Sequence, residues 1–408
     1  MKILISGAGI AGTTLAYWLL QRGFEPTLVE AAPTLRRGGY VIDFWGSGFE
    51  VAERMGLAPE LRKRGYDVHD VRIVDARGRV IGGFPVEVFR DAAHGRYVSV
   101  PRGELASMLW DALDGRVETL LGDTIVGLDD GRDGVEVRFA HAAPRRFDLV
   151  VGADGLHSAV RRVAFGDQDH VERYLGCCVA AFEASGYRPR DEDVYVMHVE
   201  VGQQVDRFSL RDDRTMFLFV WRAAEGEDEA ADLAGRKAVV RARFAATGWE
   251  CPAILDAMDA ADELYFDRMS QIYLPRWSKG RVALVGDAAA CPSLLAGEGS
   301  ALAMAGAYVL AGELASHADH RTALQRYEER LHPTYEAKQR AAIGFLDSFA
   351  PRSRLSCFLR TRGTRVFSIP WLAGRLVRSW LDPVALPNYP PPDRARRREA
   401  PSTDGASV

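Results

Sequence analysis

The stretch K-I-L-I-S-G-A-G-I-A-G, Lys2 to Gly12, decides the fold. Its first five residues are an apolar run typical of a buried strand, and its last six place three glycines in G-x-G-x-x-G spacing. Apolar residues then recur at helical spacing, and F-E-P-T-L-V-E, Phe24 to Glu30, indicates a second strand. Strand, glycine turn, helix and strand within about 30 residues form a βαβ unit, which predicts a parallel sheet with helices on its faces.

The glycine-rich turn has the residues that a dinucleotide needs. Glycine permits the tight turn and lets a pyrophosphate approach backbone N–H groups, where a helix N-terminus favours negative charge. Glu30 ends the next strand, about 20 residues on, where it can accept hydrogen bonds from a ribose. The motif predicts NAD(P) or FAD binding without deciding between them. The candidate residues in the turn are Gly7, Gly9, Ile10, Ala11 and Gly12.

Two further apolar strands end in an aspartate. D-L-V-V-G-A-D-G places Asp154 and Gly155 after one strand, and R-V-A-L-V-G-D places Gly286 and Asp287 after another. Ligands of open α/β sheets bind outside the carboxyl ends of the strands, so we expect Glu30 and both aspartates to meet at one crevice. Taken singly, each aspartate could equally be a helix cap.

Composition excludes several classes of protein. The chain has 408 residues, of which 47% are hydrophobic and 26% charged, as in an ordinary soluble globular protein with room for two domains. The formal net charge of −4 favours neither nucleic acid nor anionic membrane. Five cysteines without metal-ligand spacing predict a reducing, cytoplasmic setting and no metal site. No apolar run is long enough for stable membrane insertion.

The pattern changes twice along the chain. Short alternating runs, with a hairpin turn at Asp75 to Gly78, and a second group after residue 171 indicate an antiparallel sheet; a helix is expected at about Gly103 to Leu113. The fold class is therefore α/β, with a doubly wound, mostly parallel sheet and a second, sheet-rich unit. We expect a cofactor-binding unit at 1–65, 101–170 and 281–340, a β-sheet substrate unit at 66–100 and 171–280, a helical segment at 341–385 and a flexible tail at 386–408.

The combined motifs G-A-G-I-A-G, Arg102 in V-P-R-G-E-L-A-S-M-L, G-A-D-G-L-H-S-A-V-R and L-V-G-D-A-A…G-E-G are similar to those of a known family. The chain resembles the class A, para-hydroxybenzoate hydroxylase-like flavoprotein monooxygenases, which include the tetracycline-inactivating monooxygenases and polyketide and aromatic hydroxylases. The resemblance implies a GR2-type FAD-binding domain, a β-sheet substrate domain and a C-terminal helix.

The resemblance also assigns roles to residues. It implies that Gly7, Gly9 and Gly12 cradle the FAD pyrophosphate and that Glu30 holds the adenosine ribose. Further cofactor contacts implied by it come from Arg102 beside the flavin, with Arg36 as a second arginine, from Asp154 and Gly155 toward FAD and NAD(P)H, and from Gly286 and Asp287 toward the ribityl chain. A helix that starts at Gly297, Gly299 and Ser300 would point its N–H groups at the flavin. No protein nucleophile is required, because the cofactor carries the chemistry.

The same region departs from the family pattern. Relatives have histidine where this chain has Ala290, their proline falls later than Pro292, and an asparagine and an aspartate of theirs correspond to Ala301 and Gly306. These positions surround the expected oxygen-activating pocket. Flavin binding is thus a firmer expectation than hydroxylation.

The resemblance implies a reaction in which NAD(P)H, bound transiently, reduces FAD, and O2 yields a flavin C4a-hydroperoxide that hydroxylates an aromatic or polyketide-like molecule. Baeyer–Villiger insertion is the second expectation for oxygen transfer. An FAD-dependent reductase of the same fold and a flavin-binding accessory protein without turnover stay open, as do a monomer and a homodimer.

Two aromatic segments have more than one interpretation. In T-M-F-L-F-V-W-R-A, Phe217, Phe219 and Trp221 share one strand face and either line a substrate cavity or form sheet core. The basic, aromatic segment Phe358 to Trp380 either covers a domain seam or the substrate entrance, or lies on a membrane.

Overall fold

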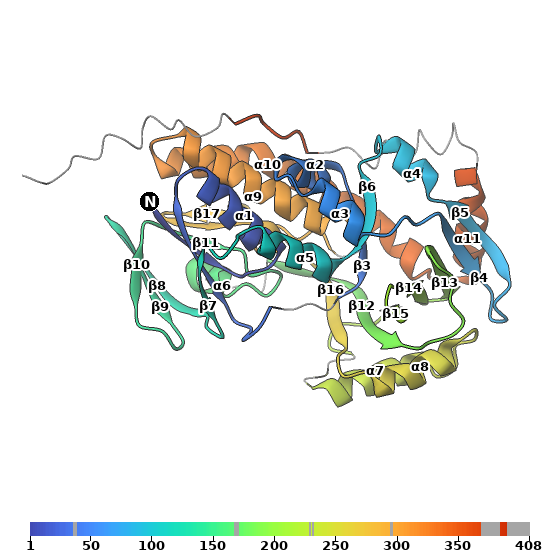
Figure 1. The fold of residues 1–408 in the computed structure, drawn as a ribbon. Coiled ribbons are helices and arrows are strands. Elements are labelled where there is room, and N and C mark those ends of the chain that lie inside the picture. The colour runs from blue at the N-terminus through green and yellow to red at the C-terminus, as the bar shows by residue number, and fades with distance from the viewer. Residues whose placement is uncertain are drawn as a thin grey trace, which may run out of the picture.

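A computed structural model describes residues 1–35, 39–166, 171–227, 230, 232–293, 297–368 and 384–389. The fold is mixed α/β, with several sheets and helices that follow them in the C-terminal part of the chain (Figure 1). Arg36 and residues 369–383, which include most of the aromatic C-terminal segment, lie outside the described residues.

The central sheet has six strands in the order β17-β18-β11-β1-β2-β7. Five of them are parallel, and β17 pairs antiparallel with β18 at the edge. Ile3, Leu4 and Ile5 are fully buried because both faces of the central strand are covered. The strands are β1 (Lys2–Ser6), β2 (Glu25–Glu30), β7 (Glu118–Leu121), β11 (Leu149–Gly152), β17 (Ser278–Lys279) and β18 (Val282–Leu284).

Helices pack against this sheet. α1 and α9 contact each other closely, and Figure 1 shows them side by side with α10 behind them. α9 is rich in alanine and glycine, which lets neighbouring backbones approach. The helices of this part are α1 (Ile10–Gln21), α5 (Arg102–Asp111), α6 (Ala159–Phe165), α9 (Gly299–Ser316) and α10 (His320–Phe349), joined by the short helix η1 (Gly286–Ala288).

A small antiparallel sheet, in the order β10-β9-β8, forms the crossover between β7 and β11. Its strands are β8 (Ile125–Gly131), β9 (Gly134–Phe139) and β10 (Arg145–Phe147). A two-stranded sheet of β3 (Val41–Trp45) and β6 (Tyr97–Pro101) lies next to α2 (Gly46–Arg54), α3 (Ala58–Arg64) and α4 (Glu87–Ala92).

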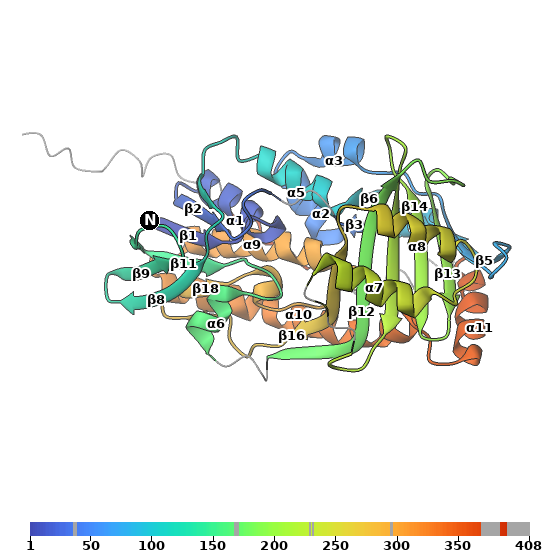
Figure 2. The same ribbon diagram turned by 90° about the horizontal axis from the view of Figure 1, so that it is seen from below.

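The largest sheet has seven strands in the order β16-β12-β15-β14-β13-β4-β5. Helices α7 (Leu233–Phe244) and α8 (Cys251–Ala260) cover one face (Figure 2), while α11 (Arg354–Gly363) and η3 (Thr364–Ser368) pack near β5 and β13. The strands are β4 (Asp70–Val74), β5 (Val80–Pro85), β12 (Glu172–Ser185), β13 (Val194–Glu200), β14 (Gln203–Ser209), β15 (Arg214–Arg222) and β16 (Tyr265–Ile272).

Two local expectations, a hairpin and a helix, are confirmed. β4 and β5 form an antiparallel hairpin, in whose turn the Gly78 N–H donates to the Asp75 carbonyl at 2.9 Å. The helix expected near Gly103 is α5. No helix in the described ranges is long and apolar enough to cross a bilayer.

Other expectations need correction. The two helices α7 and α8 lie in a region expected to contain only strands. Helix α10 is continuous from His320 to Phe349 and passes through residue 340, so the unit boundary expected there stays a prediction. Part of the expected flexible tail is docked: the Tyr389 hydroxyl donates to Glu313 Oε1 at 2.6 Å, and the Pro387 carbonyl accepts from Tyr308 at 2.9 Å.

Candidate functional site

The glycine turn after β1 combines two crowded positions with one open position. A Cβ on Gly7, whose φ is 101°, would lie 2.5 Å from the Ala153 carbonyl oxygen, and one on Gly12 would lie 1.9 Å from the Gly7 carbonyl oxygen. A Cβ on Gly9 would meet nothing within 4 Å. α1 begins at Ile10, and no side chain of the described residues caps its N-terminus. The turn therefore leaves space and free N–H groups for an anion, as a dinucleotide phosphate requires.

Glu30 lies beside this turn at the end of β2. Its Oε2 accepts from the Ala8 N–H at 2.8 Å and its Oε1 from the Ala32 N–H at 3.0 Å. These bonds fix the carboxylate, which is half-buried, next to the open space at Gly9. Each oxygen has a second lone pair with which it can accept a hydroxyl hydrogen bond.

Asp154 follows β11 on the other side of β1 and acts as a cap. Its Oδ2 accepts from the backbone N–H groups of Ala159 and Val160 at 2.8 and 3.1 Å, and its Oδ1 accepts from the Ser158 hydroxyl at 2.5 Å. Asp154 thus caps α6, and its Oδ2 also accepts from the Ser6 hydroxyl of β1 at 3.3 Å. Gly155, with φ 76°, borders open space because a Cβ there would meet nothing within 4 Å.

Asp287 lies after β18, in a turn against two helices. Gly286 has φ 63°, and its Cβ would lie 2.9 Å from the Ala11 Cβ of α1 and 3.4 Å from the Ala303 Cβ of α9. The Asp287 Oδ1 is 3.8 Å from the position that a Cβ on Gly299 would take. Burial raises the pKa of the Asp287 carboxyl, and Arg102 opposes that rise.

Strand order places the three acidic residues along one edge of the sheet. β2, β1, β11 and β18 are consecutive neighbours, so Glu30, Asp154 and Asp287 follow the carboxyl ends of three parallel strands. At about 4.8 Å between strands, β2 and β18 are roughly 14 Å apart. An elongated ligand is therefore needed to reach both ends of this row.

Arg102 brings a positive charge to the Asp287 end. Its backbone N–H donates to the Tyr40 carbonyl at 3.0 Å. Burial raises the pKa of Tyr40 to about 12, and the Arg102 charge opposes the rise, as it does at Asp287. The Arg102 side chain is exposed and forms no ion pair within the described part of the chain. It is therefore available to a ligand.

The start of α9 also faces Asp287. Gly297 has φ 65°, and a Cβ there would lie 3.4 Å from the Trp45 ring. No side chain among the described residues caps the N-terminus at Glu298, whose carboxylate pairs with Lys338 at 2.7 Å. Ser300 lies half-buried in the first turn. Two uncapped helix N-termini, those of α1 and α9, thus flank the Gly286 turn.

Close contacts explain the small residues at two positions where this chain departs from the family pattern. A Cβ on Gly48 of α2 would lie 2.4 Å from the Ala301 Cα, so α2 and α9 are in backbone contact here. A Cβ on Gly306 would lie 2.8 Å from the Tyr335 hydroxyl, which donates to the Leu302 carbonyl at 2.5 Å. Ala290 is buried. Larger polar residues would not fit at these two helix positions without rearrangement.

Three side chains that were not predicted from the sequence hold the site together. Arg161, which is 3% exposed, donates from Nη1 to the Ala288 carbonyl at 3.1 Å and so ties α6 to η1. Gln339 donates to the Cys291 carbonyl at 3.1 Å, and Gln271 to the Pro292 carbonyl at 3.0 Å. Arg161 lies within the G-A-D-G-L-H-S-A-V-R motif, which could have identified it as a site residue. No motif contains the two glutamines.

The aromatic stripe of β15 is sheet core. Phe217, Phe219 and Trp221 are at most 1% exposed and pack under α7 and α8, with Phe219 and Trp221 both in edge contact with Phe244. These three residues therefore form sheet core and do not line a substrate cavity, because two helices that were not predicted cover that face.

The opposite face of the same sheet is less completely filled. Leu218 and Met197 are half-buried there, as is Trp45, which packs in the same cluster. Tyr265 of β16 packs against the same apolar cluster as Leu218, and its ring centroid lies 5.6 Å from that of Tyr40. These apolar side chains connect the Asp287 end of the crevice with the seven-stranded sheet.

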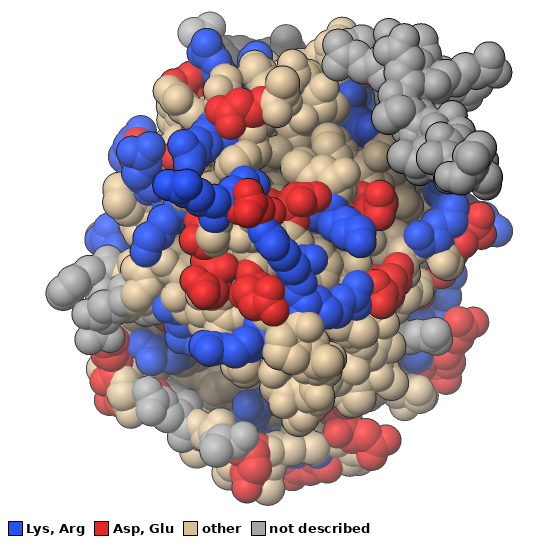
Figure 3. Space-filling view, turned by 90° about the vertical axis from the view of Figure 1, so that its left-hand side faces the viewer, with Lys and Arg blue, Asp and Glu red and all other residues tan. Residues whose placement is uncertain are grey.

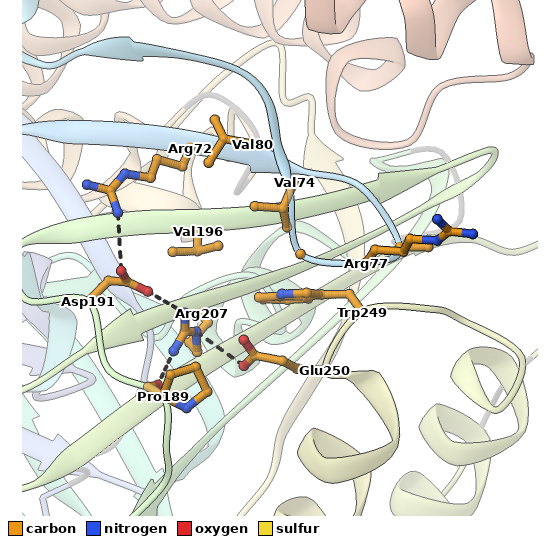
Figure 4. A pocket seen from close by; sticks show the side chains of 12 residues that line it. Arg72, Val74, Arg77, Val80, Pro189, Asp191, Val196, Arg207, Trp249 and Glu250 are labelled. Atoms are coloured by element: carbon orange, nitrogen blue, oxygen red, sulfur yellow. Dashed lines mark hydrogen bonds and ion pairs between the residues drawn. The ribbon is translucent and has the colours of Figure 1, made fainter.

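A separate pocket of about 560 Å³ opens on the α7–α8 side of the sheet (Figure 4). It is lined by Val196, Trp249 and charged residues, among which Arg207 pairs with Asp191 at 2.6 Å. On the face drawn in Figure 3, basic and acidic side chains are interspersed rather than gathered by sign. No group of His, Cys, Asp or Glu in the described ranges is arranged to hold a metal ion.

Fold and site together define a flavin-binding oxidoreductase. The chain belongs to the family described as FAD binding domain, whose profile matches residues 1–342, and within it to the class A flavin-dependent monooxygenases.

Its relatives support this assignment. It is 37% identical, over 87% of its length and 92% of the relative's, to a flavin-dependent monooxygenase of an unknown prokaryotic organism. The solved structure of tetracycline destructase Tet(55) is 33% identical with a TM-score of 0.82, covering 95% of this chain and 98% of that one. Klebsiella pneumoniae HpxO, complexed with FAD, shares the fold at 23% identity and a TM-score of 0.79, over 94% and 100% of the two chains.

Proposed function

We propose that this chain binds FAD along the row of strand ends from Glu30 to Asp287 and uses NAD(P)H and O2 to hydroxylate an aromatic or polyketide-like small molecule. The observation that carries the proposal is the alignment of three acidic residues with two uncapped helix N-termini on one sheet edge. Bound FAD would supply the redox chemistry: it accepts a hydride from NAD(P)H and, once reduced, activates O2.

The residues of the chain would bind and orient the cofactor. In this proposal the Gly7–Gly12 turn and the α1 N-terminus hold the pyrophosphate, and Glu30 accepts from the adenosine ribose. Asp287 accepts from the ribityl hydroxyls, and Arg102 and the α9 N-terminus stabilise negative charge on the flavin ring. Gly155 leaves room for the cofactor near the Asp154 cap, and Arg36 is proposed as a second arginine at the flavin.

The division of the chain is part of the proposal. We propose that the parallel sheet is the doubly wound core of an FAD-binding domain and that the seven-stranded sheet belongs to the substrate domain. The mostly parallel strand order, with helices packed on the sheet, supports the first assignment. We place the enzyme in the cytoplasm because none of its five cysteines forms a disulfide. We propose a monomer or a homodimer.

One experiment tests the reaction. The full-length protein is purified, its bound flavin is identified by absorbance, and NADPH and O2 consumption are followed with a panel of hydroxylated aromatic compounds. Substrate-stimulated NADPH oxidation with one added oxygen atom in the product is the expected result. Flavin that stays inert would replace the proposal with an accessory role, and a saturated product without O2 uptake would replace it with a reductase.

A further inference from the structure

The crevice-facing side of the seven-stranded sheet contains a buried carboxylate with one unused oxygen. Asp206 of β14 is 4% exposed. Its Oδ2 accepts from Gln204 Nε2 at 2.7 Å, but its Oδ1 is buried and has no hydrogen-bond partner among the described residues. Such a group carries a desolvation cost that the folded protein does not offset by itself.

A complementary donor lies close by on α11. Arg360 donates from Nη2 to the Gln204 Oε1 at 2.7 Å, so one glutamine holds both charged side chains. The Arg360 Nη1 is also buried without a hydrogen-bond partner in the described ranges. Burial lowers the pKa of Arg360 and the Asp206 charge raises it, yet no ion pair joins the two groups. The buried acceptor and the buried donor therefore do not satisfy each other.

Asp206 lies on the face of the sheet that is turned away from α7 and α8. Asp206 is directly opposite Leu218 in β15 and Met197 in β13, and directly opposed residues of antiparallel strands project from the same face. Both neighbours are half-buried, and Leu218 packs against the same apolar cluster as Tyr265 of β16. The neighbouring Arg207 projects to the other face, into the pocket of Figure 4.

We propose that Asp206 and Arg360 together bind one hydroxyl group of the substrate, which accepts from Arg360 Nη1 and donates to Asp206 Oδ1. A hydroxyl fits because it both donates and accepts, whereas an ether or carbonyl oxygen can only accept. This inference rests on the proposed function and narrows its substrate class to phenols, enols and alcohols. Asp206 is a specificity-determining residue in this arrangement, and the chemistry stays with the cofactor.

Matched probes test the proposal on the full-length, FAD-loaded protein. Two pairs are titrated by flavin fluorescence at about pH 8.5, above the pKa of about 7 of the Asp206 carboxyl, so that this group only accepts: 1-naphthol with 1-methoxynaphthalene, and 1,8-dihydroxyanthraquinone with its dimethyl ether. We expect at least one hydroxyl form to bind about tenfold or more tightly than its ether, as a hydrogen bond to a buried charge provides. Equal affinities, or absence of binding, in both pairs would overturn the proposal.

The Asp206→Asn variant replaces the carboxylate acceptor by an amide, whose N–H can point toward the ligand. We expect its preference for the hydroxyl probe to fall below about twofold, because two donors then face the ligand oxygen. Asp191→Asn is the control, since it makes the same charge change beside Arg207 on the opposite face and should keep the wild-type preference.

Other outcomes separate this proposal from the proposed function. Equal weakening of both probes in Asp206→Asn would indicate a structural role and overturn the hydroxyl site. A flavin-loaded Asp206→Asn protein that keeps the wild-type preference would also overturn it and leave the proposed function intact. Wild-type protein that binds no flavin would instead overturn the proposed function.

Discussion

Replacing Gly9 by alanine tests whether the open side of the glycine turn is occupied by the cofactor. Gly9 has φ −78° at the N-cap of α1, a conformation that alanine adopts without strain, and its added Cβ would meet no protein atom within 4 Å. The free energy of unfolding of the apoprotein should therefore fall by at most about 1 kcal/mol, the difference between glycine and alanine at an N-cap.

The same methyl group should obstruct a phosphate. If it displaces one charge-assisted hydrogen bond from the α1 N-terminus, it costs about 1.5–3 kcal/mol, or roughly a 10- to 100-fold rise in the Kd for FAD. Fluorescence titration of the apoprotein with FAD measures the Kd, and urea unfolding measures stability. Gly344→Ala, an exposed glycine of α10 with equally open surroundings, is the matched control and should leave the Kd unchanged. An unchanged Kd in Gly9→Ala would refute the placement of the pyrophosphate at this turn.

Three further predictions concern the row of strand ends and the large sheet. Asp287→Ala should lose its flavin during gel filtration because it removes the acceptor proposed for the ribityl chain; a fully yellow variant would contradict that role. Phe219→Ala should lower the free energy of unfolding by about 3–5 kcal/mol without changing the hydroxyl-over-ether preference, since Phe219 is core under α7 and α8; a changed preference would return it to the substrate site. Burial raises the pKa of Asp206 to about 7 despite the opposing bond from Gln204 and the charge of Arg360. Stability therefore falls as pH rises from about 4 to 7, because the carboxyl ionises in the unfolded chain while it stays mostly protonated in the fold; below pH 4 this penalty is absent. The stability gain of Asp206→Asn over the wild type should thus grow across this window, up to the order of 4 kcal/mol, and urea unfolding at a series of pH values would show a flat difference if Asp206 were not buried.

Local pattern was enough to predict the beginning of the parallel sheet. The apolar runs, the glycine spacing and the helical periodicity of the first 30 residues determine β1, α1 and β2, because each depends on neighbours within a few residues. Asp154 and Asp287 were also expected at strand ends, and they follow β11 and β18. The strand order that puts them in one row with Glu30 matches the expected convergence.

Sequence could not predict which side of a strand would be covered. The stripe of Phe217, Phe219 and Trp221 has the same period whether it faces a cavity or a helix, and only the placement of α7 and α8 decides. The pairing of Asp206 with Arg360 joins residues 154 positions apart through Gln204, a contact that no local pattern encodes. Likewise, the roles of Arg161 and Gln339 depend on loops that approach only after folding.

The docked segment at residues 384–389 has a consequence for biosynthesis. Strand β18 and helix α9, which border the same crevice as β1 and α1, are translated only after about 280 residues, and Tyr389 closes on α9 later still. During translation the glycine turn therefore leaves the ribosome long before β18 and α9 have been synthesised. We expect FAD to bind late, after translation is complete. A chain truncated before residue 384 would lack the contact between Tyr389 and α9.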